Sequence, residues 1–210
     1  MTMVAHKCRK LAYVPLVSAD IAWISAFLIL CGYAFGYEAL IRPLNNGPAS
    51  NILTIVLMVF AASATHGVIR ASHPQPVFFT VIYLGLLISV VRLFEASLGT
   101  NYLQVWINSV ILSEFPINRE LPNVTSWNTA LFFTCYFVAL WGFRTPRLKV
   151  MLASMGIAAV ILVVAWIGYA LGVPALYGNM SMITGSICSI LLIGLGSLCI
   201  VTRPRDNSRD

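Results

Sequence analysis

The chain has 210 residues, of which 59% are apolar and 10% are charged, and its formal net charge is +6. A soluble domain carries about 25% charged residues, so a chain with so few cannot cover a water-facing surface and is predicted to be an integral membrane protein. The basic residues lie at the ends of apolar runs rather than in a patch, which argues against nucleic-acid binding and for a role in membrane topology.

Six apolar runs follow one another along the chain, separated by links that contain Pro, Gly or Arg. Each run is long enough to cross a bilayer, and continuous rather than alternating apolarity favours helices over a barrel. The first run follows a basic segment but has no clear cleavage site, so we expect a retained span. These features predict one all-α membrane domain, residues 1–210, with helices at about 15–40, 50–69, 77–99, 127–143, 149–172 and 181–202.

Lysine and arginine residues are distributed unequally between the two sides of this arrangement. The N-terminal segment, the second and fourth links and the C-terminal tail hold ten of them, whereas the opposite side holds Arg42 and Arg119. Because positive charge is retained on the cytoplasmic side, both termini are predicted to be cytoplasmic and the long loop 100–126 to lie outside. The expected location is a bacterial inner membrane, with membrane lipids as neighbours.

Two of the odd-numbered helices end in nearly the same pentapeptide, GYAFG at 32–36 and GYALG at 168–172, and the third ends in the related FEASLG at 94–99. Glycine ends helices by adopting a left-handed conformation, and small polar residues cap the next helix. We therefore predict three helix-loop-helix repeats, the alternative being generic hairpin punctuation. The predicted N-caps, facing outside, are Ser50, Ser126 and Ser181.

The outer loop between the third and fourth helices contains apolar residues at helical spacing, from Leu103 to Ile111. This spacing predicts a short amphipathic helix that lies on the outer membrane face or caps the bundle. Trp106 and Trp127 are the candidate residues of a cap over a ligand pocket. The alternative, which we favour, is that this helix is a membrane anchor.

Arg92 and Glu95 lie three residues apart near the outer end of the third run, which places them on one helical face. Ionisable groups within a span usually face the bundle interior or a cavity, so one hypothesis is a ligand or proton site. The alternative is a packing pair in which Arg92 extends toward Glu95 at the interface. If the three outer helix N-termini converge, they could also bind an anionic group near Arg92.

Other polar residues suggest no reaction chemistry. Glu38 is expected to pair with Arg42, and Asp20 with Lys7 or Lys10. His66 and His73 have no accompanying carboxylate or Cys cluster, so no metal or haem site is predicted. The five cysteines include no C-x-x-C and are interpreted as packing thiols. We expect no catalytic residues, no metal and no cofactor.

Several stretches resemble a bacterial six-helix membrane sensor region found at the N-terminus of sensor histidine kinases and diguanylate cyclases. They are NTAL at 128–131, GYALGVPALYG at 168–178 and GLGSLCIVTRP at 194–204. The first half matches only in layout, because PASNILT at 48–54 stands where such regions have Pro-Asn-Thr-Ala. In those proteins the last helix leads into a catalytic domain, whereas here only PRDNSRD follows Arg203. We therefore expect no kinase or cyclase chemistry in this chain.

The resemblance implies a non-enzymatic membrane sensor-like module that passes a signal to a partner protein. The lack of an effector domain favours an alternative, a structural or accessory subunit of a larger membrane complex. A small transporter or channel is a third possibility, opposed by the few charges within the spans. In the first two cases the expected partners are other membrane proteins or a second copy of the chain.

Overall fold

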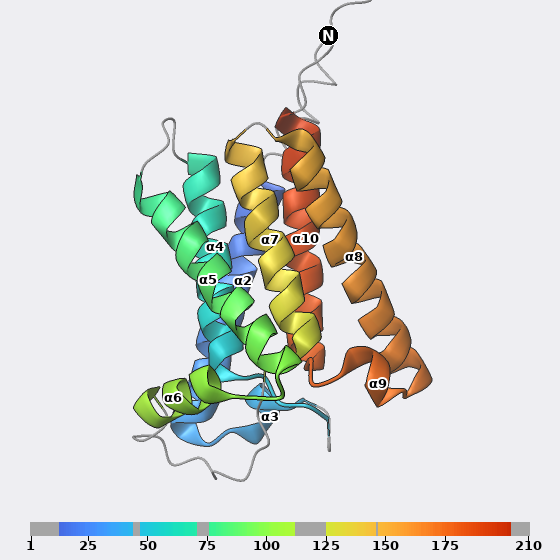
Figure 1. Cartoon of the computed structure of the whole chain (residues 1–210). Helices are drawn as coiled ribbons and strands as arrows, with labels where there is room; N and C mark the ends of the chain where they lie inside the picture. Colours follow the sequence, from blue (N-terminus) through green and yellow to red (C-terminus); the bar gives the residue numbers. More distant parts are fainter. Residues whose placement is uncertain (1–12, 44–46, 71–75, 112–124, 146, 203–210) are drawn as a thin grey trace, which may run out of the picture.

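The computed structural model describes residues 13–43, 47–70, 76–111, 125–145 and 147–202, and its elements there are helices (Figure 1). The long helices are α2 (Val14–Phe35), α4 (Ile52–Arg70), α5 (Pro76–Ser97), α7 (Trp127–Arg144), α8 (Leu148–Leu171) and α10 (Met182–Thr202). Shorter helices follow α2, α5 and α8; they are α3 (Glu38–Ile41), α6 (Tyr102–Ile111) and α9 (Pro174–Tyr177).

Five of the long helices, α2, α4, α5, α8 and α10, are long and apolar enough to cross a membrane. This finding supports the predicted class, an all-helical membrane protein. The remaining long helix, α7, begins with Trp127 and Asn128 and ends with Arg144. These polar ends reduce the apolar content of an 18-residue helix, so α7 does not qualify by itself as a span.

The first helix is shorter than predicted, because α2 ends at Phe35 instead of continuing to residue 40. Gly36 has a φ of 75° and ends the helix in the left-handed conformation, and residues 38–41 form the separate helix α3. Apart from Glu38 the sequence stays apolar through this break, so hydropathy alone could not place it. The amphipathic helix predicted in the outer loop is present as α6.

The chain turns in the same way after α2, α5 and α8. Gly36, Gly99 and Gly172 have φ values of 75°, 68° and 66°. In each turn the N–H after the glycine donates to the carbonyl four residues before it, over 2.8–2.9 Å. Each turn leads into a short helix, and α3, α6 and α9 all lie at one end of the bundle (Figure 1).

The first glycine of each pentapeptide allows close packing, whereas the last one provides the left-handed turn. A Cβ atom on Gly32 would lie 2.9 Å from side-chain atoms of Leu40 and Ile41 in α3. A Cβ atom on Gly168 would lie 2.6 Å from Leu176 Cβ and 3.0 Å from the backbone nitrogen of Tyr177 in α9. The near-identity of the two pentapeptides therefore reflects two matching requirements, a left-handed turn and close packing of the short helix against the helix before it.

Replacing Gly172 with alanine is expected to lower the free energy of unfolding by about 1–2 kcal/mol, because an L-residue is strained at positive φ. The matched control is Gly156→Ala within α8, the helix that Gly172 ends; a Cβ on Gly156 would meet no atom of a neighbouring element within 4 Å. This control should be neutral or stabilising by about 0.5–1 kcal/mol, since alanine is the better helix former. Thermal unfolding in detergent measures both, and equal effects would contradict the assigned turn.

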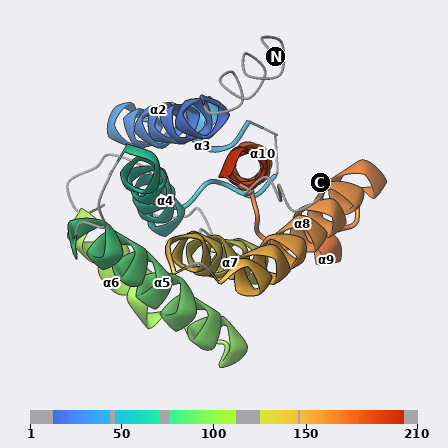
Figure 2. The same ribbon diagram turned by 90° about the horizontal axis from the view of Figure 1, so that it is seen from above.

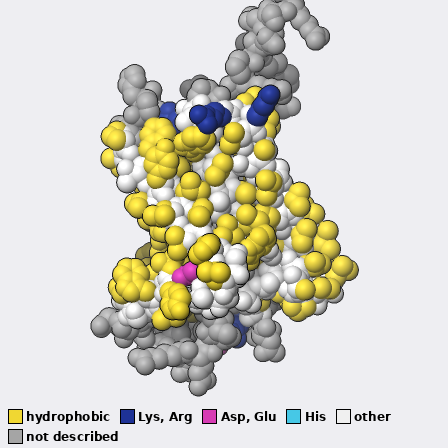
Figure 3. Space-filling view, viewed as in Figure 1, with side chains coloured by type: hydrophobic (Ala, Val, Ile, Leu, Met, Phe, Trp, Pro, Cys, Tyr) yellow, Lys and Arg dark blue, Asp and Glu magenta, His cyan; other side chains and the backbone are white. Residues whose placement is uncertain are grey.

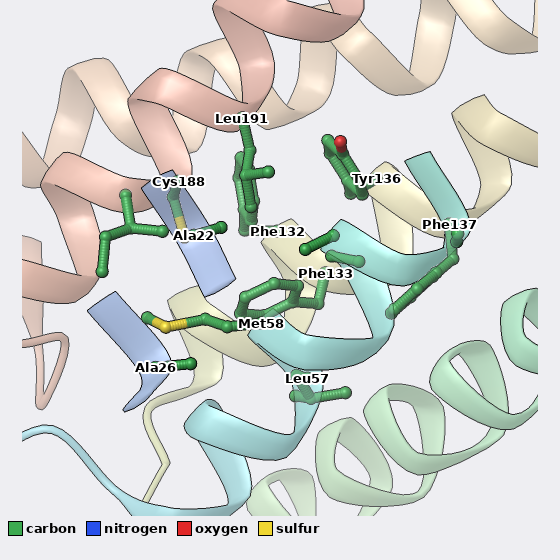
Figure 4. Close-up of a cluster of buried hydrophobic side chains, with 14 of the residues drawn as sticks. Ala22, Ala26, Leu57, Met58, Phe132, Phe133, Tyr136, Phe137, Cys188 and Leu191 are labelled. Atoms are coloured by element: carbon green, nitrogen blue, oxygen red, sulfur yellow. The ribbon is translucent and has the colours of Figure 1, made fainter. Parts of the chain in front are cut away.

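The core is built around the aromatic face of α7. Phe132, Phe133, Tyr136 and Phe137 are each at most 1% exposed. Figure 4 shows them beside side chains of α2, α4 and α10, and Figure 2 shows α5 and α8 on the outer flanks of α7. Alanines on α2 let its backbone approach this core closely; they are Ala19, Ala22 and Ala26.

The two ends of the bundle differ in charge. Arg70, Arg144, Arg147 and Lys149 are all at the end opposite to α3, α6 and α9, and Figure 3 shows basic side chains gathered there. We call this the basic end and the other the capped end. At the capped end Arg42 pairs with Glu38 over 3.6 Å, as predicted.

Candidate functional site at the capped end

Arg92 and Glu95 of α5 form a buried ion pair near the capped end. Arg92 Nη1 lies 3.4 Å from Glu95 Oε2, and the two residues are only 2% and 7% exposed. The i,i+3 spacing therefore brings the two groups together as the sequence predicted. Both side chains are thus buried within the protein, as a packing pair would be.

The remaining hydrogen bonds of this pair go to protein groups of neighbouring elements. Arg92 Nε and Nη2 donate to the carbonyl oxygen of Thr125, just before α7, over 3.1 and 3.0 Å. Arg92 Nη1 donates to the carbonyl oxygen of Thr100 over 3.1 Å, and Glu95 Oε1 accepts from the N–H of Leu103 in the first turn of α6 at 2.5 Å. The pair thus joins α6 to both α5 and α7.

The helices that start at the capped end are capped by polar side chains, though not all by the predicted ones. Ser126 and Ser181 accept hydrogen bonds from the N–H groups three residues later, each over 3.1 Å. For α4 the cap is Asn51, whose Oδ1 accepts from the N–H of Leu53 over 2.7 Å. The prediction of Ser50 as cap was one residue early, because α4 begins at Ile52.

A sequence signal for the correct register was present but missed. A cap followed three residues later by threonine occurs at the start of α4, α7 and α10. In α7 and α10 the threonine and serine hydroxyls lie 2.7 and 2.8 Å apart. The three pairs are Asn51 with Thr54, Ser126 with Thr129 and Ser181 with Thr184.

Buried hydroxyl groups connect the starts of these three helices. Ser50 Oγ lies 2.6 Å from Ser181 Oγ, which joins the segment before α4 to the start of α10. Thr54 Oγ1 lies 3.5 Å from Thr125 Oγ1, which donates to Gln104 Oε1 over 3.3 Å. These hydroxyls form hydrogen bonds with one another and with helix N–H groups. Such contacts hold the starts of the three helices together and therefore indicate a structural role. The hypothesis of an anion site at the same place gains no support from it.

One contact recurs in all three turns and explains the role of Arg92. Tyr33 in GYAFG donates its hydroxyl to the carbonyl oxygen of Ser50 over 2.6 Å, and Tyr169 in GYALG donates to that of Met180. Each acceptor is the residue just before the N-cap of the next long helix. In the third turn Arg92 donates to Thr125, which occupies the same place before Ser126. In the third turn Arg92 therefore makes the hydrogen bond that a tyrosine makes in the other two turns.

The two candidate cap tryptophans lie on the surface. Trp106 on α6 is 63% exposed and Trp127 at the start of α7 is 50% exposed. The buried face of α6 presents Gln104 and Ile107 instead. Exposed tryptophans at the end of an apolar bundle fit the favoured alternative, a membrane anchor, because indole rings prefer the headgroup region.

A second polar pair, which sequence reasoning did not find, lies toward the basic end. His66 Nε2 of α4 is 2.9 Å from Asp20 Oδ1 of α2. The Asp20 side chain is 58% exposed, whereas His66 Nδ1 is buried without a hydrogen-bond partner. Pairing across two helices depends on how they are aligned, which no local pattern reports. The partners predicted for Asp20, Lys7 and Lys10, lie outside the described residues, as do His73 and Arg119.

The described cysteines form no disulfide with one another. Cys31, Cys135, Cys188 and Cys199 are free thiols. Among the described residues no three His, Cys, Asp or Glu side chains are grouped so as to hold a metal ion. No family model, curated protein or solved structure matches this chain, so the assignment of function depends on its geometry.

Proposed function

We propose that this chain is a non-enzymatic sensor-like module of a bacterial inner membrane, which passes a signal to a partner protein. In this proposal six helices span the membrane, both termini are cytoplasmic and the capped end faces outside. One observation carries the proposal: the Arg92–Glu95 pair links the outer helix α6 to both α5 and α7. A displacement of α6 would then act directly on two long helices.

The proposed mechanism is a change between two packings of the bundle. Moving α6 draws the Leu103 N–H away from Glu95, which weakens the hold of Arg92 on Thr125. The contact between α5 and α7 then changes along its length, since packed helix interfaces shift as units rather than deform continuously. A stimulus that favours one position of α6 would shift the population of the two packings at the basic end.

The proposed three-unit architecture is supported by the recurring contacts of the turns. In each unit a positive-φ glycine ends the first helix, and a side chain near that end donates to the residue before the next N-cap. Three matching sets of contacts are more than generic hairpin punctuation requires. In this interpretation α7 is a central span, with α5 and α8 on its two flanks (Figure 2).

Spin labels on α5 and α8 test the coupling. Cysteines placed at Val77 and Leu148, both exposed near the basic end, report the distance between those helices in nanodiscs after the native thiols are replaced. Glu95→Gln removes the charge but keeps an acceptor for Leu103, and Arg92 keeps its hydrogen bonds to the carbonyl oxygens of Thr100 and Thr125. We therefore expect a less stable but folded protein with a shifted distance distribution. The matched control is Glu38→Gln in the exposed pair with Arg42. A Glu95→Gln distribution identical to that of the parent protein would contradict the mechanism.

A second candidate function, an accessory subunit of a membrane complex, is favoured by the Asp20–His66 pair. The pair lies on two candidate spans, and His66 is four residues, or about 6 Å along the helix, from Arg70. A half-exposed carboxylate about one helical turn inside the end of a span costs free energy where it faces lipid. Charged groups within the membrane are therefore usually covered by protein. A partner helix over α2 and α4 would supply that cover.

Asp20→Asn is expected to lower the recovery of co-purifying membrane proteins by at least about tenfold, because a covered polar pair contributes more than about 1.4 kcal/mol to binding. The measurement is mass spectrometry of the tagged native protein purified in mild detergent. Glu38→Gln, which changes another exposed carboxylate, should leave recovery unchanged. If the native protein is isolated alone or as a homodimer, the accessory role is wrong and the sensor proposal stands.

A further inference from the structure

Three sulfur atoms meet between α8 and α10 near the basic end. Cys199 Sγ of α10 lies 3.4 Å from Met155 Sδ and 3.7 Å from Met151 Sδ, both on α8. The two methionines are four residues apart, so they share one helical face and point at the same thiol. Met151 is 3% exposed, whereas Met155 and Cys199 are partly exposed. The group can therefore be reached from the surface.

These donors are all soft, which decides what they could bind. Thioether and thiolate sulfur select Cu(I) among the biological metals, whereas Mg²⁺ and Ca²⁺ require oxygen ligands. Zinc sites are built from cysteine, histidine and carboxylate groups, and no group of three such residues is present in the described parts of the chain. The chemistry of the three side chains thus points to a monovalent soft ion.

The spacing of the sulfur atoms also fits a single ion. With metal–sulfur bonds of about 2.3 Å, two sulfurs bound to one ion at trigonal or tetrahedral angles lie about 3.8–4.0 Å apart. The observed 3.4 and 3.7 Å differ from this by a few tenths of an ångström.

We propose that Met151, Met155 and Cys199 form a binding site for one Cu(I) ion at the basic end of the bundle. On binding, the Cys199 thiol loses its proton to solvent and the sulfur–copper bond replaces the sulfur–hydrogen bond. Copper stays Cu(I) throughout, so no electron is transferred. One positive charge enters as another leaves, so the apolar surroundings do not have to bear a new net charge. This site is independent of the signalling role proposed above.

Titration of the full-length protein in detergent tests this assignment. Cu(I), kept reduced and buffered by a chromogenic chelator, is expected to bind at one equivalent per chain. Loss of a metal ligand should exceed the 10–100-fold effect typical of outer-shell partners, so Cys199→Ser should weaken binding by at least about 100-fold. The matched control is Cys31→Ser on α2, another partly exposed free thiol, which should bind as the parent protein does.

The double variant Met151→Leu with Met155→Leu keeps the side-chain volume and should weaken Cu(I) binding by at least about tenfold. X-ray absorption of the loaded parent protein should show three sulfur neighbours. The site would be disproved if the parent protein took up no stoichiometric copper. It would also be disproved if Cys199→Ser bound copper as tightly as Cys31→Ser, or if nitrogen or oxygen neighbours dominated the absorption spectrum.

Discussion

Replacing Arg92 with methionine is expected to lower the free energy of unfolding by about 3–5 kcal/mol, because removing one partner leaves the other charge buried and unpaired. Glu95 is 7% exposed and would lose its counter-ion, while the carbonyl oxygens of Thr100 and Thr125 would lose their donors. Thermal unfolding in detergent measures the change.

The exposed pair at the same end of the bundle provides the control for Arg92. Glu38 is 66% exposed beside Arg42, and such pairs contribute about 0–1 kcal/mol, so Glu38→Gln should change stability little. The double variant Arg92→Met with Glu95→Gln removes the unpaired charge and should recover part of the loss. If Arg92→Met lowers the free energy of unfolding no more than Glu38→Gln does, the buried pair does not stabilise the fold. The hypothesis of a ligand site at Arg92 and Glu95 would then be favoured.

Replacing Gly85 with alanine is expected to destabilise the protein by about 1–3 kcal/mol through overpacking. A Cβ on Gly85 of α5 would lie 2.3 Å from Phe137 Cζ and 2.6 Å from both Cε atoms. The Phe137 ring is fully buried in α7, so it cannot move away without disturbing the core. The substitution therefore probes the contact between α5 and α7 on which the proposed signalling mechanism depends.

A compensating change on α7 makes this prediction specific. Phe137→Leu alone should also destabilise the protein, because it leaves a cavity. In combination with Gly85→Ala the leucine leaves room for the added methyl group, so the two losses should be less than additive by about 1–3 kcal/mol. Additive losses in a double-mutant cycle of thermal unfolding would mean that the two helices do not pack at Gly85. Gly156→Ala serves again as the control for a helix glycine in open space.

Local sequence patterns predicted the long helices and the glycine turns that follow three of them. Span length and apolarity predicted the membrane class, and five candidate spans agree with it. Glycine at a helix end predicted the turns at Gly36, Gly99 and Gly172, since the left-handed conformation is a property of one residue. The i,i+3 spacing predicted the Arg92–Glu95 pair, because three residues on a helix fix the relative direction of two side chains.

The sequence did not predict the contacts between helices. The hydrogen bonds of Tyr33, Tyr169 and Arg92 to the residue before the next N-cap form only once both helices are aligned. The Asp20–His66 pair likewise depends on the relative height and rotation of its two helices. In an apolar bundle, van der Waals packing sets that alignment, through contacts such as the close approach at Gly85. The sequence by itself thus determined which segments form the long helices and which glycines turn the chain, whereas only their packing decided which polar groups meet.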